Sequence, residues 1–198
     1  MIQRGVQMFT VEEACLVVVD VQGKLATIVD ESEVTIQNAS KLAQAMQVLG
    51  VPVLWLEQNP SRLGGTALEI AQHIQGQPIA KMAFSACQEE EFMTALKATG
   101  RSQFIMTGIE THICVYQTAR QLKEQGFEVE VVADAVSSRT KENKELGLEK
   151  MKALGILPTS TEMILYELLQ RADQCDTFCI RIRTIRKAAC LSCEVENL

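Results

Sequence analysis

The stretch MTGIETHICVYQTAR, residues 106–120, contains the residue types of a reactive cysteine site. Cys114 follows Thr111 by three positions, and threonine is a common cap at the beginning of a helix. If Thr111 is the cap, Cys114 lies in the first helical turn, where the helix dipole lowers the pKa of a thiol. Free backbone N–H groups at that turn could also bind an oxyanion. Two interpretations of Cys114 stay open: a nucleophile, or a small buried apolar residue.

A cysteine nucleophile needs a base and an orienting group. His112 is close in sequence, but side chains two positions apart on a helix do not face each other. The other histidine, His73, lies in the apolar helical stretch LEIAQHI and is interpreted as a packing residue. A carboxylate and a lysine remain. Asp20 could accept the thiol proton, and Lys81 could stabilise the thiolate and keep Asp20 ionised.

Metal and phosphate sites have weak sequence support. With two distant histidines, the chain has no paired-histidine metal motif, and its glycines do not form a phosphate-binding loop. Four cysteines loosely follow zinc-ligand spacing, but the apolar surroundings of Cys179 favour packing; they are Cys175, Cys179, Cys190 and Cys193. We therefore expect no metal and no cofactor.

Helical stretches that end at glycine alternate with apolar, β-rich runs along the chain. The runs CLVVVDV and VPVLWL are almost continuously apolar, which is typical of strands buried on both faces. We predict strands over 15–20, 51–56, 78–82, 102–107, 127–133 and 156–158, and helices over 33–49, 88–98, 111–125, 141–153 and 161–170. Region 57–77 is expected to be mostly loop with one short helix. This alternation predicts an α/β fold, a doubly wound parallel sheet between two helical layers.

The carboxyl ends of the strands are where such sheets bind ligands. In the common 3-2-1-4-5-6 order, the first and fourth strands flank the switch point, which would place Asp20 beside Cys114. The other residues at these ends are Trp55, Glu57, Gln58, Lys81, Phe84, Gly108–Ile113, Asp134, Ser137 and Ser138.

The composition sets limits on class and location. The chain has 198 residues, of which 47% are hydrophobic and 22% charged, and a formal charge of −6. We predict one domain over 1–175 and a helical or tail extension over 176–198. The charge argues against a nucleic-acid partner, and no apolar run approaches the ~20 residues of a membrane helix. Without signal-peptide features, and with seven cysteines read as free thiols, the chain is expected to be a soluble cytoplasmic protein.

Four motifs together carry a family resemblance: CLVVVDVQ, IAKMAFSA, TGIETHICVYQTA and VVADAVSSRT. Their order and spacing over roughly residues 11–170 resemble isochorismatase-like cysteine hydrolases, and EQNPSRLGGT is most similar to the isochorismatase domain-containing subgroup. The resemblance implies a six-stranded parallel sheet, a homo-oligomer, and a catalytic triad of Asp20, Lys81 and Cys114. It also implies a cis peptide bond at Ile109–Glu110, with an oxyanion hole formed by the backbone N–H groups of Glu110 and Cys114.

Departures from the family pattern narrow the expected chemistry. Nicotinamidases of this superfamily carry an Asp-x-His metal motif where this chain reads WLEQNPS, and an aromatic residue where it has Leu25. Isochorismatases that act on a vinyl ether lack the cysteine. The presence of Cys114 therefore favours a small amide or related carbonyl–nitrogen substrate, cleaved through a thioester without a metal. Trp55, Phe84 and Ile109 could line the substrate pocket or pack in the core.

Two other functions remain open from the sequence. The chain could be a catalytically idle binding or scaffold protein whose basic, cysteine-bearing tail is the working surface. It could also be a redox-responsive thiol protein, because an activated cysteine oxidises readily.

Overall fold

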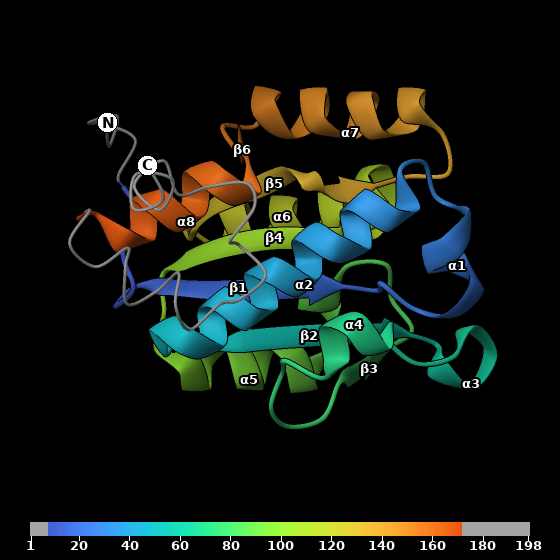
Figure 1. The fold of residues 1–198 in the computed structure, drawn as a ribbon, viewed down its shortest axis with the longest axis horizontal. Helices are drawn as coiled ribbons and strands as arrows, with labels where there is room; N and C mark the ends of the chain where they lie inside the picture. Colours follow the sequence, from blue (N-terminus) through green and yellow to red (C-terminus); the bar gives the residue numbers. More distant parts are fainter. Residues whose placement is uncertain (1–7, 172–198) are drawn as a thin grey trace, which may run out of the picture.

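The computed structural model describes residues 8–171, which form a six-stranded parallel sheet between two helical layers (Figure 1). The strand order is β3-β2-β1-β4-β5-β6, as predicted. The strands are β1 (Ala14–Val19), β2 (Val53–Gln58), β3 (Ile79–Lys81), β4 (Gln103–Ile109), β5 (Glu128–Ser137) and β6 (Leu157–Thr159). The predicted α/β fold class is confirmed. The predicted extension over 176–198 and the four cysteines of the zinc alternative lie outside the described residues.

The helices cover both faces of the sheet. In Figure 1, α2 crosses in front of the sheet with α8, while α5 and α6 lie behind it. The principal helices are α2 (Ser32–Leu49), α5 (Glu90–Thr99), α6 (Tyr116–Glu124), α7 (Lys141–Ala153) and α8 (Thr161–Leu169). The short ones are α1 (Gly23–Ile28), α3 (Pro60–Leu63), α4 (Leu68–Ala71) and η1 (Ala86–Gln88). None of the helices in this described part is long and apolar enough to span a bilayer.

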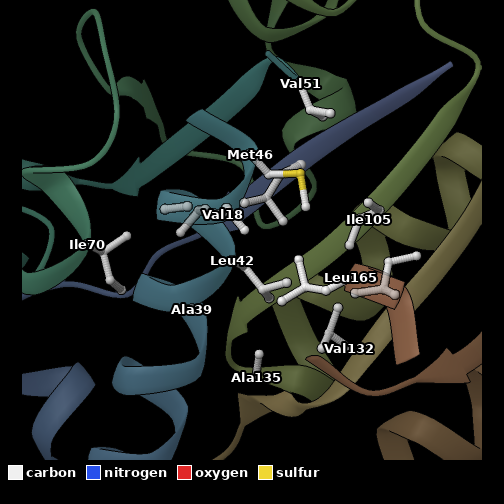
Figure 2. Close-up of a cluster of buried hydrophobic side chains, with 14 of the residues drawn as sticks. Val18, Ala39, Leu42, Met46, Val51, Ile70, Ile105, Val132, Ala135 and Leu165 are labelled. Atoms are coloured by element: carbon white, nitrogen blue, oxygen red, sulfur yellow. The ribbon is translucent and has the colours of Figure 1, made fainter. Parts of the chain in front are cut away.

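Two hydrophobic cores lie on opposite faces of the sheet. Alternate residues of β1 point to each face, and all six are buried. Figure 2 shows the core under α2, which we call the α2-side core; it includes Val18, Leu42, Ile105, Val132 and Leu165. The core on the other face, the α6-side core, includes Cys15, Val17, Phe104, Cys114 and Val131. This two-sided burial explains why the strands read as continuous apolar runs.

The strands β1 and β4 approach each other unusually closely at Gly108. A Cβ atom there would lie 2.0 Å from the carbonyl oxygen of Val19, and the residue has a φ of 119°. Val19 and Gly108 are also paired in register. Only glycine fits this contact, since a side chain would clash with backbone and prefers negative φ. The contact holds the ends of β1 and β4 together, directly before Asp20 and the Ile109–Glu110 peptide.

Glu130 in β5 is a buried carboxylate whose ionisation should destabilise the fold. Its Oε2 atom accepts no hydrogen bond from the described residues. Burial, and then the charge of Glu167, raises the pKa of Glu130 to about 7. The folded chain therefore keeps this proton to higher pH than the unfolded chain. The stability that the protonated group provides is fully present below pH 4.5 and falls as pH rises through 7.

The variant Glu130→Gln is accordingly expected to exceed the wild type in unfolding free energy by about 1–3 kcal/mol at pH 8. Near pH 4.5 the two proteins should be nearly equal, because the wild-type carboxyl is then protonated in the folded state. Urea unfolding at both pH values measures the difference. The exposed change Glu149→Gln serves as control and should show no such pH dependence. A less stable Glu130→Gln protein at pH 8 would contradict this account.

Candidate active site

A buried ion pair lies at the carboxyl edge of the sheet. Asp20 directly follows β1 with a φ of 52°, and Lys81 ends β3. Lys81 Nζ lies 2.7 Å from Asp20 Oδ2. Their exposed fractions are only 1% and 2%. Because β2 separates β1 from β3, the long lysine side chain spans the end of β2 to reach the aspartate. The structure thus brings together two residues that the sequence placed at this edge.

Cys114 joins this pair from the other side of β1. It belongs to the α6-side core and is 7% exposed. Cys114 lies near enough to Asp20 and Lys81 for both to act on its thiol, Asp20 raising the pKa of the thiol and Lys81 lowering it. Asp20 Oδ1, the carboxylate oxygen that does not bind Lys81, accepts no hydrogen bond of ordinary geometry from the described residues. The Cys114 thiol, like Lys81, favours the ionised form of the Asp20 carboxyl and so lowers its pKa, although burial has the larger effect.

The electrostatics of the cluster differ from the sequence-based expectation. Burial, and then the negative charge of Asp20, raises the pKa of Cys114 to about 12, while Lys81 acts in the opposite direction. The expectation of a lowered thiol pKa is wrong because burial outweighs the helix-end effect. Burial likewise raises the pKa of Asp20 despite the Lys81 charge. At rest the site holds a thiol beside a carboxylate that is more basic than an exposed one.

The segment after β4 differs from the helix start predicted at Thr111. Residues Thr111–Val115 form a π-helical turn, η2, and the cap position is Glu110. The carbonyl oxygen of Glu110 accepts from the backbone N–H groups of Ile113 at 3.0 Å and Val115 at 3.3 Å, the residues on either side of Cys114. Thr111 is the first residue of the turn, and its hydroxyl has no hydrogen-bond partner among the described residues, so its predicted role as cap is wrong. The Ile109–Glu110 peptide bond is cis.

Two contacts hold this segment in place. Glu110 Oε2 accepts from Arg139, from its backbone N–H at 3.0 Å and from Nε at 3.1 Å. Gly147 of α7 lies so close that a Cβ atom there would be 3.0 Å from the backbone N and Cα of His112. The loop after β5 and the helix α7 therefore fix the turn that carries Cys114.

His112 does not serve Cys114. Its Nδ1 atom lies 2.9 Å from Ser138 Oγ, in the loop after β5. Ser137 Oγ donates to the Asp30 carbonyl oxygen, and Asp134 accepts from the Thr161 backbone at the beginning of α8. These polar residues in and just after β5 make contacts that hold the fold together, as His112 does.

Two of the three predicted pocket residues are buried in the α2-side core, which is one of the two roles that the sequence left open for them. Trp55 and Ile109 both belong to that cluster. Phe84 is 56% exposed and follows the end of β3 by three residues, so its role as a pocket residue stays a prediction. Within residues 8–171, no group of three or more His, Cys, Asp or Glu side chains could hold a metal ion.

Sequence reasoning missed the functions of two glutamines. Gln58 was recognised at the edge of the sheet without a role, and it contacts Lys81 Nζ at 2.6 Å through Oε1. Gln22 was not recognised at all, although it is fully buried and bonded to Gln58. The position of both residues just past or at a strand end was the available signal.

Alkylation of Cys114 provides a direct test of these electrostatics. Asp20→Asn removes a negative charge that raises the pKa of the thiol, so alkylation should reach its midpoint at lower pH than in the wild type. Lys81→Met removes the opposing positive charge and should shift the midpoint upward. Iodoacetamide labelling followed by mass spectrometry of the tryptic peptide 102–120, in which Cys114 is the one cysteine, measures both. An upward shift in Asp20→Asn would contradict this arrangement of charges.

Comparison with known proteins gives one consistent result. The isochorismatase domain matches residues 2–163. Isochorismatase domain-containing protein 2 from Danio rerio is 34% identical over 170 residues, 85% of each chain. A MAR1 ribonuclease structure from Caenorhabditis elegans superimposes with a TM-score of 0.85 at 30% identity, covering 93% of this chain and 95% of that one. The YcaC gene product from Escherichia coli, an octameric hydrolase of unknown specificity, gives 0.84 at 22% identity, covering 93% and 97%. The chain therefore belongs to the isochorismatase family, together with the isochorismatase domain-containing proteins.

Proposed function

We propose that the protein is a cysteine hydrolase of small amides or related carbonyl–nitrogen compounds, working without a metal. The observation that carries this proposal is the position of Cys114 beside the buried Asp20–Lys81 pair, near enough for both charges to act on its thiol. Membership of the isochorismatase family supports a hydrolase role. Glu57 lies in the segment where nicotinamidases carry their metal motif, and its carboxylate accepts hydrogen bonds from the N–H and hydroxyl of Thr66 at 2.7 and 2.8 Å.

In the first half-reaction Asp20 accepts the Cys114 proton as the sulfur attacks the carbonyl carbon. A carboxylate with a raised pKa suits this task because it binds the proton more tightly than an exposed aspartate. The backbone N–H groups of Glu110 and Cys114 bind the tetrahedral oxyanion, and the Lys81 ammonium stabilises the negative charge nearby. Collapse of the intermediate breaks the C–N bond, Asp20 returns its proton to the nitrogen, and ammonia or an amine leaves a thioester on Cys114.

In the second half-reaction water hydrolyses the thioester. Asp20 removes a proton from the water as its oxygen attacks the acyl carbon, and the same N–H groups bind the second oxyanion. The C–S bond then breaks, the carboxylic acid leaves, and the proton on Asp20 returns to the sulfur. The site ends in its starting protonation state, with no net consumption except substrate and water.

A panel of small amides, ureides and carbamoyl compounds tests the proposal, scored for ammonia or amine release. Turnover of at least one member, with an acyl adduct on Cys114 detected by mass spectrometry, is the expected result. Turnover that persists in Cys114→Ala would contradict the mechanism. Absence of turnover across the panel would favour the idle scaffold, and loss of the Cys114 thiol under mild peroxide would then favour the redox protein.

RNA should be tested alongside these compounds, because the structurally similar C. elegans protein is called a ribonuclease. The net charge of −6 and the burial of Cys114 favour a small neutral substrate over a polyanion. Cleavage of RNA that depends on Cys114 would reverse this preference.

The homo-oligomer and the cytoplasmic location stay predictions. Light scattering of the full chain, and of a chain lacking residues 176–198, measures the molecular mass and so tests the predicted homo-oligomer.

A further inference from the structure

Lys81 is held by more than its partner Asp20. An ammonium group has three N–H donors. One donates to Asp20 Oδ2 at 2.7 Å and one to Gln58 Oε1 at 2.6 Å. The nearest backbone acceptors, the carbonyl oxygens of Ala83 and Phe84, lie at 3.4 Å, which is long for a charged donor. One charged and one neutral acceptor therefore set the position of Lys81 Nζ.

The amide of Gln58 has only one orientation that satisfies its neighbours. While Oε1 accepts from Lys81, Nε2 donates to the Met82 carbonyl oxygen at 2.8 Å. The reverse orientation would turn an NH₂ group toward an ammonium and an oxygen toward a carbonyl. Gln58 is thus held as an acceptor facing Lys81.

The backbone of Gln58 is held in turn by the fully buried side chain of Gln22. Gln22 Oε1 accepts from the Gln58 N–H at 2.6 Å, and Gln22 Nε2 donates to the Gln58 carbonyl oxygen at 3.0 Å. The same Nε2 atom donates to the Gly64 carbonyl oxygen at 2.7 Å. The side chain of Gln22 therefore acts like a piece of neighbouring strand, pairing with both backbone groups of one residue.

We propose that Gln58 is a positioning residue that fixes the Lys81 ammonium beside Asp20, and that Gln22 holds Gln58 in place. This inference rests on the proposed cysteine-hydrolase function. Without the Gln58 acceptor, the ammonium would lose one of its two short hydrogen bonds and would no longer be held in one position. It would then stabilise the Cys114 thiolate less.

The experiment measures the pH profile of Cys114 alkylation by iodoacetamide in the full chain, as described for Asp20→Asn. Gln58→Met keeps the side-chain volume and removes the acceptor, and Gln58→Asn keeps the amide and shortens its reach. Both are expected to move the midpoint to higher pH, in the direction of Lys81→Met, and to slow alkylation at pH 9 by about three- to tenfold. Gln77→Met makes the same change in an exposed loop and should leave the profile unaltered.

The outcomes separate this inference from the proposed function. A lowered melting temperature with an unaltered profile would make Gln58 merely structural and overturn the inference, while a shift in Lys81→Met would leave the proposed site intact. If neither Lys81→Met nor the Gln58 variants shift the profile, the proposed site fails as well. If Gln58→Met does not fold, the pH profile of Cys114 alkylation in Gln58→Asn alone tests the inference.

Discussion

Replacing Cys114 with alanine is expected to reduce hydrolysis of any substrate found in the panel by at least about 10⁴-fold. The substitution removes the atom that forms the covalent intermediate, and neither Asp20 nor Lys81 can replace it. The remaining activity would come from the oxyanion-binding N–H groups and from substrate binding. The fold should survive, because the change removes one sulfur atom from a residue at the margin of the core.

The rate of ammonia or amine release, measured at saturating substrate, checks this expectation. Cys87→Ala is the matched control, because Cys87 is a half-buried free cysteine packed against the same core. Its activity should stay within about twofold of the wild type. A Cys114→Ala protein with a comparable rate would show that the nucleophile lies elsewhere.

Replacing Lys81 with methionine is expected to cost about 3–5 kcal/mol of unfolding free energy at pH 8. The change leaves Asp20 buried without the positive charge 2.7 Å from it. Burial already raises the pKa of Asp20 above its unfolded value, so ionisation of this group destabilises the fold as pH rises above that value. Loss of Lys81 enlarges this effect. The destabilisation should therefore be largest at pH 8 and become smaller toward pH 4.

Two further variants isolate the unpaired charge as the cause. Combining Lys81→Met with Asp20→Asn removes both charges and should recover most of the lost stability. Lys97→Met, an exposed change on α5, should stay within about 0.5 kcal/mol of the wild type. Denaturant unfolding at several pH values measures all of them. An equal loss at every pH, or no recovery in the double variant, would mean that packing rather than charge is responsible.

The sheet and the site cluster were predictable because they depend on the pattern of apolar residues along the strands and on which residues follow the strand ends. Continuous apolar runs indicated buried parallel strands, and the strand-end rule placed Asp20, Lys81 and Cys114 at one edge. The structure brings these three together. The helix α1 was missed because its sequence GKLATI is short and has no capping signal. Helices of one or two turns depend on tertiary contacts more than on their own sequence.

The errors within the site have a common physical origin, which is burial. Position in a first helical turn predicts a lowered thiol pKa, but the side chains that bury Cys114 come from distant segments. For Trp55 and Ile109 two roles stayed open, because the sequence of β2 and β4 does not reveal which face carries each residue when both faces are apolar. The roles of Gln22 and Gln58 depend on hydrogen bonds between residues 36 positions apart, which no local pattern encodes.

The contact between Gly108 and Val19 has a consequence for how this protein can change. The separation between Asp20 and the Glu110 segment is set by main chain touching main chain, not by side chains packed between them. Substitutions among the apolar residues of either core would alter how firmly the layers adhere, yet leave this separation almost as it is. The side chains of the two cores can therefore be replaced without changing the spacing of the site residues at the carboxyl edge of the sheet.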